Sequence, residues 1–295
     1  MLVPLRHFRI FGFPQFTRRP ASLCAAYPYF TMPTSASFSH VAELDGAGRA
    51  LIDILSSVRR PDGYCCTLVD YSRAEEFRTR RIEETGVPIT LIDMTLRALA
   101  LSTMGNPPMR SLVSGYKIYR SEGLDIGCSV ATDTPIAPVI VFRDAQNLSL
   151  EAIHFQRLAM TKVAVEEQEK NLAQLAKTTR FLPDAVRRKL ISRFVNGAEN
   201  RKKLGGTIAL SAIELDDMEW MCPAHIGGAM LLSLGGIKAR PMVVDGRVEA
   251  RLCALATFMI DQRVIHPMRA MRVFRRFRRA LENPQKMVAK MESER

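Results

Sequence analysis

The stretch Asp261-Gln262-Arg263-Val264-Ile265-His266-Pro267 carries most of the information about how this chain of 295 residues folds and works. It follows an apolar run from Leu252 to Ile260, which predicts a buried strand, and it precedes a segment rich in arginine. An imidazole just after such a strand is a candidate general base, since its ordinary pKa lies near ~6.5. The amide of Gln262 has no pKa in a useful range, so this side chain cannot take a proton in catalysis.

Further segments accompany this stretch in a fixed order along the chain. They are, from the N-terminus, Val3-Pro4-Leu5 with Arg9, Glu43-Leu44-Asp45, Gly86-Val87-Pro88-Ile89-Thr90, Asp125-Ile126-Gly127-Cys128-Ser129-Val130-Ala131-Thr132, Ile136-Ala137-Pro138-Val139-Ile140, Arg143-Asp144-Ala145, Gly205-Gly206-Thr207-Ile208-Ala209-Leu210-Ser211, Gly235-Gly236-Ile237 and Leu281-Glu282-Asn283-Pro284. In order and spacing the set resembles the catalytic domain of the dihydrolipoyl acyltransferases of 2-oxo acid dehydrogenase complexes and the related chloramphenicol acetyltransferases. The stretch at 261–267 reads Asp-His-Arg-x-x-Asp-Gly in that family. Gln262 therefore takes the place of the His, His266 of the second Asp, and Pro267 of the Gly.

The resemblance implies an α+β fold of the chloramphenicol acetyltransferase type, in which a mixed β-sheet is covered by helices in two layers. It implies one acyltransferase-like catalytic domain over residues 1–295, without a lipoyl or peripheral-subunit-binding domain, and a homotrimer or a multiple of it. Residues 178–204 lie in a stretch longer than in the family, and we expect a helical insert there. From the residues themselves, Ser149 predicts the start of a long helix, and Pro138 to Phe142 predicts a buried strand.

Acyl transfer from a thioester needs a base that takes the proton of the attacking group and a donor that stabilises the tetrahedral oxyanion. The resemblance places the base at Gln262, acting across a subunit boundary, and the oxyanion donor at Ser211, on a strand whose family pattern is Thr-x-Ser-Asn. Ala209 and Ala212 replace the Thr and the Asn of that pattern, so one hydroxyl remains. Loss of a general base typically costs about 10²- to 10⁴-fold in rate.

Two histidines are candidates for the missing base. His266 lies within the same stretch, and Pro267 changes the turn that directs its ring. His225, in Cys222-Pro223-Ala224-His225, takes the place of the Asn in the Asn-Pro-Pro turn of the family. The alternative is that both rings are structural and that the site has lost its chemistry. The histidines without a motif around them are expected to be structural; they are His7, His40 and His154.

The sequence therefore predicts a stand-alone acyltransferase-like protein that acts on a thioester of coenzyme A or of a carrier protein through a non-standard active site. The alternative within the same fold is a catalytically inactive structural trimer, and a third is a module that binds membranes or polyanions. Transfer, hydrolysis and condensation are all compatible with these residues. No covalently bound cofactor is expected, and a coenzyme A thioester is the expected substrate.

Composition argues against several other classes. The six cysteines form no Cys-x-x-Cys pair and no Cys/His ligand spacing, which argues against a zinc or redox-dithiol site and suits a reducing compartment. No apolar run reaches 18 residues, so a membrane-spanning helix is not expected. The first 42 residues contain no acidic side chain and imitate a transit peptide. The start of the family's domain falls within them, which favours the cytoplasm over an organellar matrix.

The last helix carries much of the net charge of +12. It is expected to have an apolar stripe opposite a basic face that attracts coenzyme A phosphates, binds nucleic acid or is simply solvated. The stripe consists of Met271, Phe274, Phe277 and Leu281, and the basic face of Arg269, Arg272, Arg275, Arg276, Arg278 and Arg279. Nucleic acid is disfavoured because no recognition motif accompanies this face.

The helix that begins at Pro183 is also expected to be two-sided. One side has Val186, Leu190, Ile191 and Phe194, and the other has Arg187, Arg188, Lys189 and Arg193. Such a helix can make a peripheral contact with an anionic membrane or pack on a neighbouring subunit, and packing is favoured for a family built on trimers. Trp220 is expected either to line an acyl pocket or to lie in the core.

Overall fold

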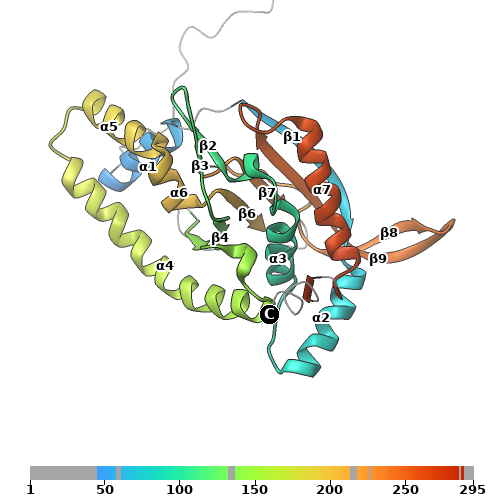
Figure 1. Ribbon diagram of the computed structural model, residues 1–295. Helices are drawn as coiled ribbons and strands as arrows, with labels where there is room; N and C mark the ends of the chain where they lie inside the picture. The colour runs from blue at the N-terminus through green and yellow to red at the C-terminus, as the bar shows by residue number, and fades with distance from the viewer. Residues whose placement is uncertain are drawn as a thin grey trace, which may run out of the picture. The chain divides into compact units, whose positions relative to one another are not determined.

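A mixed sheet forms the centre of the fold. The computed structural model describes residues 45–57, 61–131, 137–212, 218–225, 227–285 and 287–288, and within them seven strands form one sheet (Figure 1). Six lie in the order β1, β9, β7, β6, β4, β5, and β8 pairs with β9. Their bounds are β1 Asp62–Asp70, β4 Ile126–Ser129, β5 Val139–Phe142, β6 Ile208–Ala212, β7 Met230–Leu234, β8 Lys238–Val244 and β9 Arg247–Asp261. The pairs β4–β6 and β6–β7 are parallel, and the others are antiparallel.

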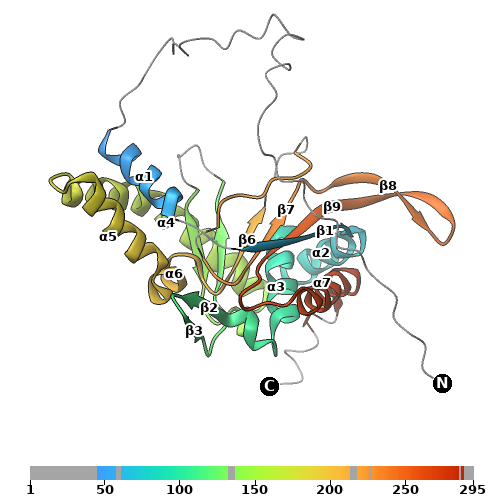
Figure 2. The ribbon, with the colours of Figure 1, turned by 90° about the horizontal axis from the view of Figure 1, so that it is seen from above.

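Helices cover the sheet and extend beyond it. The α-helices in the described residues are α1 Gly46–Ser57, α2 Ser72–Thr85, α3 Leu91–Thr103, α4 Leu150–Thr179, α5 Asp184–Asn196, α6 Ala198–Gly205 and α7 Pro267–Glu282. Helices α2, α3 and α7 pack together on one face (Figure 2), where the rings of Phe274 and Phe277 lie 4.4 and 5.7 Å from that of Phe258 on β9. Helix α1 packs against α4 and against α5. A separate pair of short strands joins β2 Ser111–Ser114 to β3 Lys117–Arg120.

This architecture is the predicted mixed sheet covered by helices. The long helix begins where Ser149 predicts it, because the Ser149 hydroxyl accepts a hydrogen bond from the amide of Ala152 at 3.1 Å and so caps α4. The run from Pro138 to Phe142 forms β5. The strand predicted over Leu252–Ile260 is longer than expected, since its first half continues into a hairpin with β8 that projects from the rest of the sheet (Figure 2).

Several sequence predictions concern residues outside the described ranges. They are the opening segment Val3-Pro4-Leu5 with Arg9, the histidines His7 and His40, and most of the predicted edge strand Glu43-Leu44-Asp45. Asp45 itself precedes α1, and its carboxylate accepts a hydrogen bond from the amide of Gly48 at 2.7 Å. The end of α4, helix α5 and most of α6 lie within residues 178–204; their status as an insert stays a prediction. No helix in the described ranges is long and apolar enough to cross a membrane.

Helix α5 buries a different side from the one predicted. Ile191 is buried, and Arg187 lies on the same side with 7% of its surface exposed. The guanidinium of Arg187 donates to the buried carboxylate of Asp53 on α1 at 2.8 Å, because a buried carboxylate needs a cation or other donors to offset its desolvation. The other members of the predicted apolar side are exposed: Val186, Leu190 and Phe194.

The apolar stripe of α7 is confirmed at Phe274, Phe277 and Leu281, which are buried. It is wrong at Met271, which is 37% exposed. Ala270 and Val273 are buried in its stead, since a period of 3.6 residues places 270, 273, 274, 277 and 281 on one face. All six arginines lie on the exposed side of the helix.

Candidate active site

The turn after β9 is held by its own acidic residue. Asp261 is buried, and its carboxylate accepts two hydrogen bonds from the guanidinium of Arg263, at 2.8 and 2.6 Å. It also accepts one from the Arg263 amide at 3.1 Å. The amides of Val264 and Ile265 donate to the carbonyl of Asp261. The turn that carries Gln262 is therefore fixed by its own side chains and backbone.

Gln262 is exposed at this turn and lies against β1. Its amide donates to the carbonyl of Pro61 at 3.2 Å. Its side chain rests on Gly63 so closely that a Cβ at position 63 would come within 2.4 Å of Nε2. The glycine leaves room for the Gln262 carboxamide, which offers N–H donors and a carbonyl acceptor but no group that can hold a proton in catalysis.

His266 caps the helix that follows. It is the N-cap of α7, and its Nδ1 accepts a hydrogen bond from the amide of Met268 at 3.3 Å. A neutral imidazole has one acceptor nitrogen and one N–H. When Nδ1 accepts, Nε2 carries the proton. In this conformation the exposed His266 ring can donate a hydrogen bond from Nε2 but cannot take a proton there.

His225 is buried in the segment that leads to β7, with 6% of its surface exposed. Its Cε1 would lie 2.9 Å from a Cβ at Gly227, so the ring packs directly on the glycine backbone. Arg201 on α6 fixes this backbone by donating to the Gly227 carbonyl from Nε and Nη2, at 3.1 and 2.7 Å, and to the Val113 carbonyl at 2.7 Å. The structure therefore encloses the His225 ring within one protomer.

Ser211 lies well away from the Gln262 turn. The register places Ser211 opposite Ser233 on β7, and Ser233 opposite Thr257 on β9. Gln262 follows Thr257 by five residues, a distance of about 16 Å along an extended chain. Gln262, His266 and His225 thus share the end of the sheet where β6 and β7 begin, and Ser211 is not brought to them within one chain.

A polar row on the sheet near Ser211 was not anticipated from the sequence. The Trp220 indole donates to the Thr257 hydroxyl at 2.8 Å, and that hydroxyl donates to the sulfur of Cys66 at 3.0 Å. The Ser233 hydroxyl donates to the carbonyl of Met221. Trp220 is 52% exposed, so its placement in the core is wrong. An indole N–H needs a hydrogen-bond acceptor when it is partly buried. From the sequence, this need was the one indication that Trp220 has a polar partner.

The segments that carry the family resemblance meet beside this sheet. The Thr207 amide donates to the Asp125 carbonyl at 2.7 Å, and the Asp125 amide donates to the Thr207 hydroxyl at 3.1 Å. The Asp125 carboxylate accepts from Arg143 at 2.8 Å. A Cβ at Gly228 would come within 1.5 Å of the Thr207 carbonyl oxygen, so only glycine fits there. An adjoining cavity of about 760 Å³ has equal numbers of cationic and acidic lining residues: Arg120, Arg143, Lys202, Lys203, Glu122, Asp125, Asp144 and Glu199. Because the cationic and acidic residues are equal in number, the cavity has no net charge that would attract an anionic thioester.

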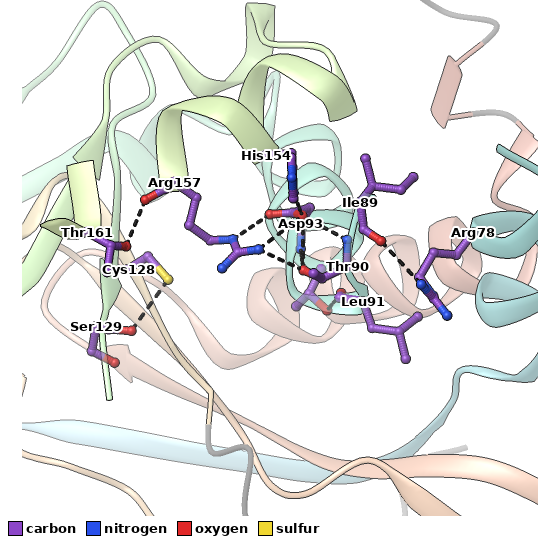
Figure 3. Close-up of polar contacts among 11 residues, drawn as sticks. Arg78, Ile89, Thr90, Leu91, Asp93, Cys128, Ser129, His154, Arg157 and Thr161 are labelled. Carbon is purple, nitrogen blue, oxygen red and sulfur yellow. Dashed lines mark hydrogen bonds and ion pairs between the residues drawn. The ribbon is translucent and has the colours of Figure 1, made fainter. Parts of the chain in front are cut away.

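A buried ionic cluster joins α3 to α4. Asp93 accepts a hydrogen bond from Nε of Arg157 at 2.7 Å and pairs with Nδ1 of His154 at 2.9 Å; Figure 3 shows the three side chains together. Asp93 also forms a capping box with Thr90 at the start of α3. Burial alone would raise the pKa of Asp93, but the hydrogen bonds and charge of Arg157, with His154 and Thr90, hold it below its ordinary value. His154 therefore has the structural setting expected of it.

The fold is similar to that of acyltransferase catalytic domains. Residues 168–289 match the family of 2-oxoacid dehydrogenases acyltransferase (catalytic domain), which confirms the resemblance in that part of the chain. A search of curated protein sequences found no match.

Solved structures confirm the fold over most of the chain. A probable dihydrolipoamide acetyltransferase from Listeria monocytogenes is 18% identical with a TM-score of 0.59, covering 84% of this chain and 96% of that one. The cubic core of a pyruvate dehydrogenase multienzyme complex is 19% identical with a TM-score of 0.60, covering 86% and 96%. The dihydrolipoamide acetyltransferase of Azotobacter vinelandii is 20% identical with a TM-score of 0.59, covering 86% and 95%. At these identities the likeness concerns the fold.

Proposed function

We propose that this protein exchanges acyl groups between thiols, using thioesters of coenzyme A or of a carrier protein, at a site assembled between protomers of a trimer. The observation that carries the proposal is the separation of Ser211 from the Gln262 turn by about 16 Å along the sheet. The two can contribute to one site only if they come from different chains. Support comes from the similar structure that is part of a cubic core, and from the Azotobacter study, which concerns the role of a serine, a histidine and an asparagine in catalysis.

Because position 262 offers no base, the acyl acceptor must be a group that is already partly deprotonated near neutral pH, such as a thiol. A thiol with an ordinary pKa near 8.5 is about 3% thiolate at pH 7, whereas a hydroxyl is almost wholly protonated. The acceptor thiolate attacks the thioester carbonyl carbon, and the Ser211 hydroxyl donates to the oxyanion that forms. The original carbon–sulfur bond then breaks, and the departing thiolate takes a proton from water. Gln262 contributes hydrogen bonds from its amide, and no step requires it to move a proton.

A non-catalytic trimer of the same fold is the second candidate. It is favoured by two observations on the histidines. Nδ1 of His266 is engaged as the cap of α7, and the His225 ring is enclosed against Gly227. Acyl transfer to a hydroxyl or an amine would then lack its base. This candidate predicts that the wild-type protein exchanges thioesters no faster than the solution does.

Mixing two inactive variants tests the site between protomers. Ser211→Ala and Gln262→Ala each remove one half of the proposed site, and trimers reassembled from equal amounts contain intact boundaries at about a quarter of positions. We expect each variant alone to be slow and the mixture to regain about a quarter of the wild-type rate. The double variant Ser211→Ala with Gln262→Ala, mixed with Ser211→Ala, is the matched control and should regain nothing. A mixture that reacts no faster than its components would show that Ser211 and Gln262 of different chains do not form one site.

A further inference from the structure

Helix α7 presents an all-arginine outer face. Ala270, Val273, Phe274, Phe277 and Leu281 are buried against the sheet and its neighbouring helices, so the helix cannot rotate. The opposite side carries six arginines and no lysine over about 15 Å of helix; they are Arg269, Arg272, Arg275, Arg276, Arg278 and Arg279. In Figure 1 the helix runs alongside β1 at the outside of the sheet. Guanidinium groups bind carboxylates in a two-point geometry that ammonium groups lack.

Within the described part of the chain, little negative charge balances this face. Arg278 pairs with Glu282 at 3.2 Å, and the described residues provide no ion pair for the other five arginines. Of the four glutamates on the adjoining α2, Glu75 pairs with Arg78 and Glu84 with Arg81, and the described residues show no ion pair between α2 and α7. Like charges three and four residues apart weaken a helix. The positive charge of this face is therefore largely unbalanced by the described residues, and a partner with negative charge can balance it.

A partly apolar hollow lies among the arginines. A cavity of about 400 Å³ opens between β1 and α7. Its lining residues are Cys65, Cys66, Thr67, Met271, Phe274, Arg275 and Arg278. Met271, which lines it, is partly exposed, as is Met268 in the first turn of α7. A cationic face with an apolar hollow suits a protein surface on which an apolar side chain stands among carboxylates.

Other polyanions fit this face less well. A membrane-bound helix inserts its apolar side, but that side of α7 is buried in the core. Single-stranded nucleic acid stacks its bases on aromatic side chains, and both phenylalanines of α7 are buried. Six arginines along about 15 Å of helix also exceed what the phosphates of one coenzyme A molecule require.

We propose that the arginine face of α7 is the docking surface for an acidic carrier domain that delivers an acyl thioester to the Gln262 turn. This inference rests on the proposed function. Its position supports it, since α7 begins at Pro267, immediately after His266, and Arg269 and Arg272 lie in its first two turns. A domain bound there stands beside the turn at which the thioester is to react.

Charge reversal on α7 tests the docking surface. The variant Arg272→Glu, Arg276→Glu, Arg279→Glu is compared with Lys162→Glu, Lys170→Glu, Lys177→Glu on α4, where the same change in net charge falls on exposed residues. The probe is a fluorescently labelled acidic acyl carrier protein with an acylated phosphopantetheine arm, and its dissociation constant is measured at low and high ionic strength. We expect the α7 variant to bind at least about tenfold more weakly and the α4 variant within about twofold of wild type. Replacing the same three arginines by lysine keeps the charge but removes the two-point geometry, so binding should weaken, though less than in the glutamate variant.

The outcomes separate the docking surface from the chemistry. Equal weakening by both glutamate variants, or no binding of the carrier protein by wild type, would overturn the proposal. Tighter binding of anionic vesicles or of single-stranded DNA, lost in the α7 variant, would overturn it in favour of those partners. Exchange between acyl-coenzyme A and a small thiol is measured in parallel and should be equal in all four proteins. If it is absent throughout while carrier binding still depends on α7, the proposed chemistry fails and the docking surface stands.

Discussion

The side chain of Gln262 lies directly on the backbone of Gly63, with no room for even a methyl group between them. A Cβ at position 63 would come within 2.4 Å of Nε2 of Gln262 and 3.2 Å of its Cγ. The first residues of β1 therefore determine where the Gln262 carboxamide can lie. The turn on the other side is fixed by the pairing of Asp261 with Arg263.

Gly63→Ala should displace Gln262 without unfolding the protein. The new methyl group must push the carboxamide away from β1, and a displacement of about 1 Å at a reacting site can cost about 10²-fold in rate. We expect thioester exchange to slow by about that factor, while the free energy of unfolding changes by about 0.5 kcal/mol or less, because the exposed Gln262 side chain can move away from the new methyl group. Exchange kinetics and urea denaturation on the same sample separate the two effects. An unchanged rate would show that Gln262 has no part in the reaction.

Gln262→His by itself should not create an acetyltransferase that relies on a histidine base. The new ring would lie against the Gly63 backbone, where the Gln262 side chain now lies. His266 would remain in place as the cap of α7. We expect base-dependent transfer from acetyl-coenzyme A to dihydrolipoamide only in the triple variant Gln262→His, His266→Asp, Pro267→Gly. Asp is a favoured N-cap, so the start of α7 should survive the change at position 266. Full transfer by the single variant would indicate an active site that is otherwise intact.

Ser211→Ala should impair the chemical step selectively. If its hydroxyl donates to the oxyanion, its loss lowers turnover by about 10²- to 10³-fold with little change in substrate affinity. Ser233→Ala is the matched control, because Ser233 lies beside Ser211 in the register of β6 and β7. Steady-state kinetics with acetyl-coenzyme A and a thiol acceptor provide the measurement. Equal effects of the two substitutions would assign both hydroxyls to packing.

Features encoded by neighbouring residues were predictable from the sequence. The cap of α4 at Ser149 and the buried strand from Pro138 to Phe142 follow from local patterns, and both are present. The resemblance of the segment around Gln262 to the family pattern could be recognised from the order of the surrounding segments. Local chemistry and segment order were sufficient for the fold class.

Features that depend on distant partners were not predictable. Periodicity assigned Arg187 to the exposed side of α5, but Asp53, 134 residues earlier, draws it inward. Asp93 gives no sign in the sequence of pairing with Arg157, which is 64 residues away. The separation of Ser211 from Gln262 likewise depends on strand register, which the residues of one strand do not specify.

Removing the carboxylate of Asp93 should be the more damaging of two acidic substitutions. Asp93→Ala leaves Arg157 and His154 without their buried partner, and such losses cost about 3–5 kcal/mol of unfolding free energy. Asp184→Ala removes a largely exposed carboxylate near the start of α5 and should cost about 1 kcal/mol or less. Urea denaturation at pH 7 compares them. Equal costs would contradict a stabilising role for the cluster.

The contribution of Asp93 should depend on pH in a defined direction. Its pKa in the folded protein is held below the ordinary value of 3.8. A carboxylate of this kind stabilises the fold fully above its unfolded pKa, and the stabilisation is lost as pH falls through the lower, folded pKa. The difference in unfolding free energy between wild type and Asp93→Ala should therefore be constant near neutrality and shrink below about pH 4. A difference that grows on acidification would contradict the assignment.

The dependence of thioester exchange on pH tests most directly whether the site works without a general base. The rate of acetyl transfer from acetyl-coenzyme A to small thiols of different pKa is measured from acid to alkaline pH, with the solution reaction subtracted. The rate should rise about tenfold per pH unit and level off at the pKa of each thiol, because the enzyme supplies no proton acceptor. A plateau at one pH near 6 to 7 for every thiol, lost on substitution of His266 or His225, would show that a histidine base is at work and would contradict the mechanism proposed for Gln262.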